Sequence, residues 1–283
     1  MLLSTLSFAV MNALVKYLIS YHTFQLVFFR SFGSLIITFS ILKSKNIPLL
    51  GNQKTLLLIR GLVGVSAMIL FFLGIRSIGV ASSVTLRYTS PIFASILAVV
   101  FFKEKIKIPQ WTFFILAFFG VYLIESFQPL SSSVGVLMVL GAAFLSAIVY
   151  LIISKIGDND HPVTIVHYFM FIATIVGGIG SVFFWKTPEL KELLLLISLG
   201  FFGFFGQYYM TLAFQNYKPH LVAPFKYVEV FFTFTMSIFL LDEEYDFIQI
   251  LGATLIILGL LLNIWYKFGF KQIKSNRKLG LFR

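Results

Sequence analysis

Ten apolar stretches follow one another along the chain, and this pattern limits the fold more than any other feature. They cover roughly residues 2–20, 23–42, 54–75, 80–102, 108–125, 133–154, 162–185, 190–214, 219–241 and 246–266. Each is long enough to cross the ~30 Å hydrocarbon core of a bilayer as a helix. Because the backbone of a lipid-embedded segment must form its hydrogen bonds within the protein, these stretches should be helices. The sequence therefore predicts an all-α integral membrane protein with ten transmembrane helices.

The composition supports a membrane protein and argues against a nucleic-acid-binding one. Hydrophobic residues make up 59% of the chain and charged residues only 12%, against about 25% charged residues in a soluble domain. The net charge of +11 would by itself suit nucleic acid. The Lys and Arg residues, however, gather in short loops and in the tail, as the positive-inside rule expects. We therefore expect a lipid bilayer around the chain and no nucleic-acid partner.

The distribution of Lys and Arg also predicts the orientation. Basic residues occupy the loops around 43–54 and 103–107 and the tail at 267–283, whereas the acidic loop 242–246 has neither Lys nor Arg. Placing the basic segments inside puts both termini in the cytoplasm. We expect a multi-pass protein of the cytoplasmic (inner) membrane.

The two halves of the chain match each other when the sequence is shifted by 139 residues. The matched pairs include His22 with His161, Arg87 with Lys226, Tyr88 with Tyr227, Glu104 with Glu243, and Gly120 with Gly259. Each half holds five spans, and an odd number of spans inverts the second half in the membrane. The sequence predicts two inverted five-helix repeats, residues 1–127 and 133–266, followed by a basic cytoplasmic tail at 267–283. Folds of this kind place the substrate near the midplane, between the repeats.

Two ionisable residues, Lys226 and Glu229, lie inside the ninth span. Glu229 is roughly 15 Å into it at 1.5 Å per residue, about half of the hydrocarbon core. Charges at this depth are costly and usually face a bundle interior or an aqueous path. The two residues are three apart, so they share a helix face and can neutralise each other. Two interpretations stay open: a structural ion pair, or a lining of the substrate or ion path, which the depth in the membrane favours.

The repeat places a second set of polar residues in the equivalent span. The matched positions are Arg87 with Lys226, Ser90 with Glu229, and Tyr88 with Tyr227. We expect Arg87 and Lys226 to bind an anionic group of the substrate, with Ser90 beside them. The two tyrosines are candidates for stacking on a ligand, although core packing is the more common role.

Further polar residues lie within other spans. Arg30 is a candidate clamp for a carboxylate or phosphate, which a guanidinium group matches bidentately, or an arginine that holds helix ends. Arg60 lies near the start of span three, and we expect it to snorkel to the interface in a structural role. Asn12 and Gln207 are candidate substrate contacts, or hydrogen bonds between helices. His167 is a candidate carrier of a coupling proton, although a lone histidine is more often a hydrogen-bonded core residue.

Enzyme and metal-site motifs are missing from the sequence. There is no His-Glu-x-x-His, no Gly-x-Ser-x-Gly, no phosphate loop and no Cys/His metal spacing. The chain also has no cysteine, which excludes thiol catalysis. We expect a protein that is not an enzyme and that needs no cofactor or metal.

Three motifs carry a resemblance to a known family. They are Phe-Phe-Arg at 28–30, Ser-Pro-Ile-Phe-Ala at 90–94 and Ala-Pro-Phe-Lys-Tyr-Val-Glu at 223–229. With them the chain resembles the EamA-type branch of the drug/metabolite transporter superfamily, over residues 3–266. The resemblance implies ten helices in two repeats, and the export or import of small metabolites. The second repeat lacks the Ser-Pro of the first, so its pocket departs from the family pattern.

These observations together predict a secondary-active transporter of a small polar organic metabolite that works by alternating access. The substrate would be amino-acid-like, nucleoside- or adenosyl-like, or vitamin-like, with an anionic group. Glu229 would either pair with Lys226 or carry a coupling proton, and exchange against a counter-substrate is the other mode of coupling. Two alternatives remain: a non-transporting membrane scaffold or accessory subunit, and an intramembrane enzyme acting on a lipid headgroup. The sequence leaves the oligomeric state and the direction of transport open.

Overall fold

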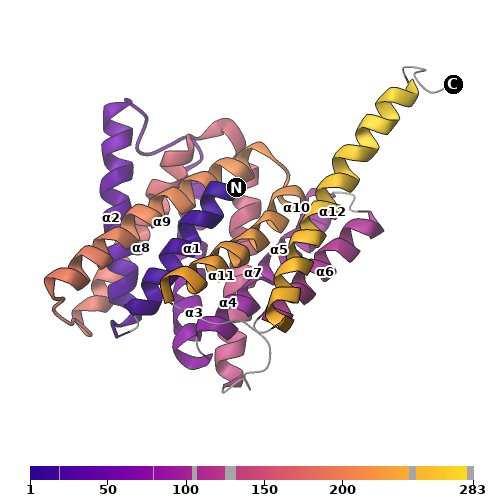
Figure 1. The fold of residues 1–283 in the computed structure, drawn as a ribbon. Coiled ribbons are helices and arrows are strands. Elements are labelled where there is room, and N and C mark those ends of the chain that lie inside the picture. The colour runs from indigo at the N-terminus through magenta and orange to yellow at the C-terminus, as the bar shows by residue number, and fades with distance from the viewer. Residues whose placement is uncertain (19, 79, 104–106, 125–131, 242–246, 279–283) are drawn as a thin grey trace.

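The secondary structure of the computed structural model is helical throughout the residues it describes, which are all except 19, 79, 104–106, 125–131, 242–246 and 279–283 (Figure 1). The elements are α1 (Leu2–Tyr17), α2 (Thr23–Ser44), α3 (Lys54–Ile78), α4 (Val80–Arg87), α5 (Ser90–Phe102), α6 (Ile108–Ile124), α7 (Ser133–Ile156), the 3-10 turn η1 (Gly157–Asn159), α8 (Pro162–Val182), α9 (Leu190–Asn216), α10 (Pro219–Val222), the 3-10 turn η2 (Ala223–Tyr227), α11 (Val228–Leu241) and α12 (Phe247–Lys278). The predicted all-α membrane fold is confirmed.

Five of the described helices are long and apolar enough to cross a membrane by themselves: α2, α3, α7 with η1, α8 and α9. Shorter apolar helices form α1, α5, α6 and part of α12. The long helices begin and end close to the predicted bounds. These bounds follow from hydropathy because lipid accepts only long apolar segments with an internally bonded backbone.

Spans four and nine are broken, although the sequence predicts each of them as one continuous helix. Span four consists of α4 and α5, which separate at Tyr88 and Thr89, and span nine consists of α10, η2 and α11. A proline accompanies each break, because Pro91 lies in the first turn of α5 and Pro224 lies in η2. Proline lacks a backbone N–H and clashes with the preceding turn, so a regular helix does not run through it. Tyr88 and Tyr227 mark the same position in the predicted repeats.

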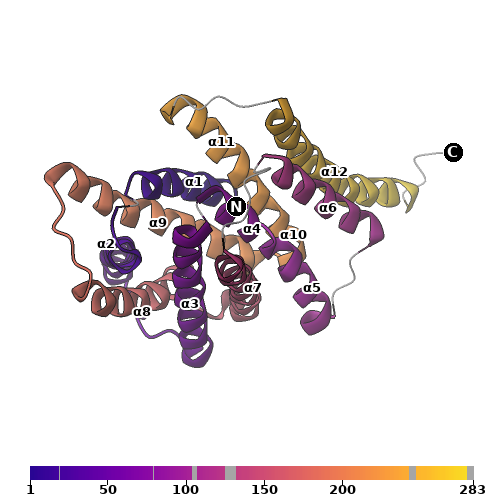
Figure 2. The ribbon, with the colours of Figure 1, turned by 90° about the horizontal axis from the view of Figure 1, so that it is seen from below.

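The most extensive helix contacts join the first half of the chain to the second. Helix α2 packs on α8, α6 on α12, α3 on α7, and α1 on α9; Figure 2 shows the α2–α8 and α6–α12 pairs side by side. Where α2 crosses α9, a Cβ atom built on Gly200 would lie 2.6 Å from the Gly33 Cα. A methyl group at this crossing would push the helices apart, so the close approach depends on glycine. The two halves therefore pack closely at this crossing.

Helices α2 and α8 begin with the same kind of cap. Nδ1 of His22 accepts from the backbone N–H of Phe24 at 3.4 Å, and Nδ1 of His161 accepts from the N–H of Val163 at 3.2 Å. Each cap satisfies one of the N–H groups that a helix start leaves unbonded. The two histidines are one of the pairs that match in the shifted sequence.

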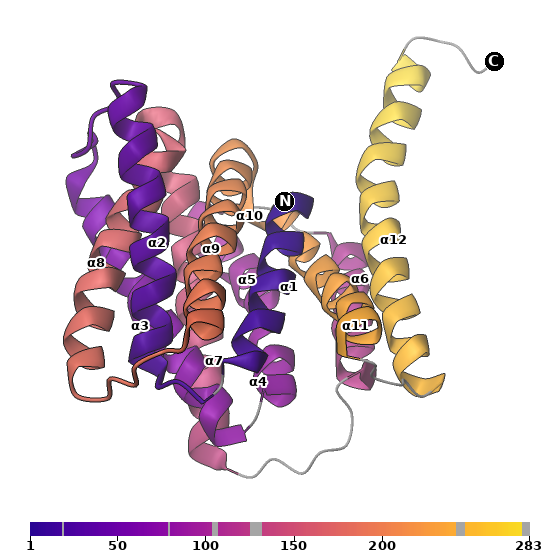
Figure 3. The same cartoon turned by 60° about the vertical axis from the view of Figure 1, so that its left-hand side comes forward.

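Helices α6, α11 and α12 stand together on the side of the bundle away from α2, α3 and α8 (Figure 3). Helix α12 continues past residue 266, where the sequence predicts the end of span ten, and runs to Lys278. Its last turns lead away from the bundle (Figure 1). They cover most of the segment that the sequence predicts as a basic tail.

Candidate functional site

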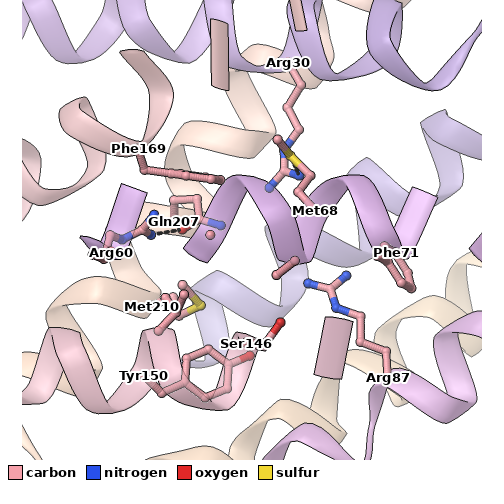
Figure 4. A pocket seen from close by; sticks show the side chains of 13 residues that line it. Arg30, Arg60, Met68, Phe71, Arg87, Ser146, Tyr150, Phe169, Gln207 and Met210 are labelled. Carbon is pink, nitrogen blue, oxygen red and sulfur yellow. Dashed lines mark hydrogen bonds between the residues drawn. The ribbon is translucent and has the colours of Figure 1, made fainter. Parts of the chain in front are cut away.

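A small cavity lies between helices of both halves, and three arginines point into it (Figure 4). Arg30 comes from α2, Arg60 from α3, and Arg87 from the end of α4. Helices α7, α8 and α9 supply further walls, including Tyr150 and Phe169. The cavity volume of about 50 Å³ has room for a few water molecules. None of the described residues that line this arginine cavity is acidic.

Arg60 lies inside the bundle and is only 1% exposed. Its Nη2 donates to Oε1 of Gln207 at 2.8 Å, and its guanidinium carbon lies 4.2 Å from the ring centre of Phe169. Nε and Nη1 have no hydrogen-bond partner among the described residues. The expectation of a snorkelling arginine is therefore wrong. Arg60 faces α8 and α9, and Phe169 and Gln207 hold its side chain inward instead of along the lipid surface.

Arg30 and Arg87 have weak partners around the same cavity. Arg30 Nη1 donates to Sδ of Met68 at 2.9 Å, and a thioether is a weak acceptor. In the part of the chain that the structure describes, Nε of Arg30 has no hydrogen-bond partner. The guanidinium carbon of Arg87 lies 4.3 Å from the ring centre of Phe71, which is a cation–π contact. Neither contact supplies a negative charge, so the arginine cavity carries positive charge that its walls do not neutralise.

A second, smaller cavity adjoins the first, because Arg87 lines both. Its lining includes Asn12, Lys226 and Glu229, which we call the ion-pair cluster. Lys226 Nζ donates to Oε2 of Glu229, and Asn12 Nδ2 donates to Oε1 of the same carboxylate at 3.0 Å. Lys226 Nζ also lies 4.4 Å from the ring centre of Phe8. Both charges of this cluster are buried and matched.

The breaks in spans four and nine position these charges. Arg87 is the last residue of α4, Lys226 lies in η2, and Glu229 lies in the first turn of α11. A cation at the end of a helix and a carboxylate in the first turn both interact favourably with the helix dipole. The prolines thus place helix ends, rather than helix middles, beside the charged side chains.

The two tyrosines of the predicted repeat meet between the broken spans. The ring centres of Tyr88 and Tyr227 are 6.2 Å apart, and both side chains are buried. Ser90 is buried as well and lines the smaller cavity beside Tyr88. The predicted site residues that gather around the two cavities are Asn12, Arg30, Arg87, Tyr88, Ser90, Gln207, Lys226, Tyr227 and Glu229.

His167, the second predicted proton carrier, lies elsewhere. Its Nδ1 is 3.0 Å from Oγ1 of Thr38, and it lines an apolar groove formed by α2, α8 and the segment before α3. This groove shares no lining residue with the arginine cavity. The matched pair Glu104 and Glu243 lies outside the described residues.

Sequence reasoning missed the apolar walls of the arginine cavity. Met68, Phe71 and Phe169 contact its guanidinium groups. In a chain with 35 Phe residues, nothing local marks the few that face an arginine. Arg60 could have been found, because a cation within a span usually faces the bundle interior.

A polytopic helix bundle with a cationic cavity between its two halves is typical of membrane proteins that bind polar solutes. The comparison with known families then fixes the particular class. The chain belongs to the EamA-like transporter family, whose model matches residues 1–126 and 133–265.

Relatives of the chain cover nearly all of it. It is 26% identical over 263 residues to the pseudopaline exporter CntI of Pseudomonas aeruginosa, which covers 91% of this chain and 92% of the relative. It is 28% identical over 264 residues to the S-adenosylmethionine uptake transporter of Rickettsia conorii, covering 90% and 88%. It is 27% identical over 280 residues to solute carrier family 35 member G1 of Mus musculus, covering 91% and 75%.

A solved crystal structure with 13% sequence identity has a TM-score of 0.78 over 93% of each chain, which shows a shared fold. Together with the family match, these relatives make the protein a multi-pass membrane transporter of small metabolites and not an enzyme.

Proposed function

We propose that the protein is a secondary-active transporter that moves a small polar organic metabolite with an anionic group by alternating access. The observation that carries this proposal is the arginine cavity, where Arg30, Arg60 and Arg87 meet without an acidic residue among the described lining. Unmatched cations inside a membrane protein are costly. Guanidinium groups match the oxygens of carboxylates and phosphates. An anionic substrate would supply the missing negative charge.

The size of the cavity favours a carrier that changes shape. Its volume of about 50 Å³ is far below the roughly 300–1,000 Å³ of pockets that enclose a metabolite. The cavity must therefore widen to admit one. Helices from the two halves form its walls, so a rocking motion of one half against the other would open it, as in other carriers built from inverted repeats.

We assign different roles to the two groups of charges. Arg30, Arg60 and Arg87 bind the anionic group, and Gln207 orients Arg60 through their hydrogen bond. Lys226 holds Glu229, so its ammonium group is a positioning cation rather than the first anion ligand. The sequence analysis placed the anion contact on Arg87 and Lys226, and this proposal moves it to Arg30, Arg60 and Arg87.

Glu229 is the candidate for a coupling proton, since its carboxylate adjoins the cavity that Arg87 shares. Replacing it as Glu229→Gln keeps an acceptor oxygen for Asn12 but removes the ionisable group. We expect this variant to lose uptake driven by a pH gradient and to keep counterflow exchange, measured in proteoliposomes. Unchanged gradient-driven uptake would rule out Glu229 as the proton carrier and favour exchange against a counter-substrate.

The first test of the proposed function is a thermal-stability screen of the purified protein against a metabolite panel. A ligand that binds only the folded state stabilises it by RT ln(1 + [L]/Kd), about 2.7 kcal/mol at a hundredfold excess over Kd. We expect anionic metabolites to raise the unfolding temperature of the wild type and of Arg76→Ala, an exposed control on the same helix. The shift should vanish in Arg60→Ala. A neutral metabolite that stabilises all three proteins equally would contradict the proposal.

We further propose that the protein lies in the cytoplasmic (inner) membrane with both termini in the cytoplasm, as the Lys and Arg distribution supports. A fluorescent protein that folds only in the cytoplasm, fused after residue 283, should be bright. A periplasm-active reporter at the same place should be inactive, and the opposite pair of results would reverse the orientation.

A further inference from the structure

The charges around the two adjoining cavities are not balanced. Arg30, Arg60 and Arg87 line the first cavity and Lys226 lines the second, whereas Glu229 is the one acidic residue among the described residues that line either. Lys226 and Glu229 form an ion pair with each other. The one carboxylate in the described lining already pairs with Lys226, so the three guanidinium groups are in excess over the acidic groups.

Two of these groups also hold hydrogen-bond donors without a partner. They are Nε of Arg30, and Nε and Nη1 of Arg60. The two residues are 5% and 1% exposed, so bulk solvent does not reach them. Figure 4 shows Arg30 and Arg60 entering from different sides of the cavity. A buried charged donor without an acceptor is strongly unfavourable, and two separate arginines are in this state.

The aromatic contacts reduce this cost but do not remove it. Phe169 lies under Arg60, and Phe71 lies under Arg87. A ring face attracts a cation but carries no net charge. Arg87 is partly exposed, in contrast to Arg30 and Arg60. Within the described part of the chain, none of its nitrogen atoms is a buried donor without a hydrogen bond. Arg30 and Arg60 are therefore the two arginines whose buried donors need hydrogen-bond acceptors.

We propose that the transported solute is a small organic dianion whose charged oxygens reach both Arg30 and Arg60. This rests on the proposed function as an anion transporter and narrows its substrate class. A monoanion would satisfy one guanidinium group and leave the second unpaired. Dicarboxylates and phosphate esters share the required chemistry, because both present charged oxygen pairs that fit a guanidinium fork. Arg87, where the two cavities meet, keeps its positive charge, which the ring of Phe71 stabilises.

Sulfate is the first probe, because it is a divalent oxyanion small enough for the cavity as it stands. The unfolding temperature of the full-length protein in detergent is measured against sulfate and against nitrate as the monovalent control. We expect a saturable sulfate shift with an apparent affinity at least about tenfold tighter than for nitrate. This shift should persist in Arg76→Gln and disappear in Arg30→Gln and in Arg60→Gln. General salt stabilisation would instead rise without saturation and equally in all four proteins, and that result overturns the proposal.

A second set of probes distinguishes the two classes of dianion, dicarboxylates and phosphate esters. Succinate is compared with its monoamide, succinamate, and glycerol 3-phosphate with glycerol. A preference for succinate over succinamate indicates a dicarboxylate, and a shift with glycerol 3-phosphate alone indicates a phosphate ester. If succinamate binds as tightly as succinate and nitrate as tightly as sulfate, the dianion is wrong while anion transport still stands. If neutral metabolites bind, and bind equally to the arginine variants, both the dianion and the proposed anion transport fail.

Discussion

Arg60 and Lys226 are both cations buried in the middle of the bundle, but their surroundings differ. Lys226 has a carboxylate, Glu229, which Asn12 also contacts. Arg60 has an amide oxygen, an aromatic ring and two donors with no partner. The two residues adjoin neighbouring cavities, so depth in the membrane does not distinguish them. What distinguishes them is the ion pair, which Lys226 has and Arg60 lacks within the described residues. We infer that Lys226 stabilises the fold and that Arg60 binds a ligand.

The largest effect should come from breaking the matched pair. Glu229→Ala leaves Lys226 as an unpaired charge in the core, and loss of one partner of a buried ion pair costs about 3–5 kcal/mol. Chemical or thermal unfolding in detergent measures this loss. The double variant Lys226→Met with Glu229→Ala should recover most of the stability. If it does not, Glu229 stabilises the fold through a contact other than Lys226.

Removing an unmatched charge should have the opposite effect on stability. Arg60→Met takes out a cation that has no counter-charge, so the ligand-free protein should be as stable as the wild type or more stable. Anion affinity should fall by about 2–5 kcal/mol, about thirtyfold at the lower end. Unfolding and titration of the same preparations test both parts. A loss of stability comparable to that of Glu229→Ala would remove the distinction between the two regions.

A smaller effect should follow from taking away the neutral donor of the ion-pair cluster. Asn12→Ala leaves Oε1 of Glu229 without the hydrogen bond from Asn12, and an unsatisfied buried group costs about 1–3 kcal/mol. Asn216→Ala is the matched control, because Asn216 is exposed on α9 and surface changes usually stay within about 0.5 kcal/mol. Equal unfolding temperatures for the two variants would show that Lys226 alone holds the carboxylate.

The smallest effect is expected at His167, which lies outside both cavities. His167→Gln removes or weakens one hydrogen bond with Thr38, worth about 0.5–1.5 kcal/mol. Uptake driven by a pH gradient should stay within twofold of the wild type, measured in proteoliposomes beside Glu229→Gln. Complete loss of gradient-driven uptake in His167→Gln would transfer the proton pathway to the α2–α8 groove.

The fold was largely predictable because lipid restricts what a span can be. Ten apolar segments had to be helices. Hydropathy set the bounds of the five long helices closely, but it placed the end of span ten at 266, whereas α12 runs to Lys278. The breaks at Tyr88 and at Tyr227 could not be set in this way. Proline is tolerated within membrane helices when neighbouring groups satisfy the backbone, so Pro91 and Pro224 permitted either a kink or a break. Only packing against the other half decides between them.

The sequence predicted which charged residues lie in the candidate site, but it did not predict which partners each of them contacts. Lys226 and Glu229 stood out because charges inside an apolar run are rare. Their three-residue spacing allowed the observed ion pair, but the sequence alone left a lining of the substrate path as the favoured alternative. The inward course of Arg60 depends on Phe169 and Gln207, which lie more than a hundred residues away in the sequence. A local pattern contains no information about such a contact, and the snorkelling interpretation failed for that reason.

The buried arginines also bear on how the chain enters the membrane. Insertion of an arginine at the centre of a span costs about 2.5–3.5 kcal/mol, whereas each Leu, Ile, Phe or Val contributes about 0.3–0.6 kcal/mol in favour. Roughly four to twelve apolar side chains are then needed to offset one arginine. Helices α2 and α3 each carry an arginine in their first half, Arg30 and Arg60, and both helices remain strongly apolar overall. The abundance of Phe, Leu and Ile thus has a role in biogenesis. It lets each of these spans insert into the bilayer with its arginine before the second half of the chain, which contacts Arg60 through Phe169 and Gln207, has been synthesised.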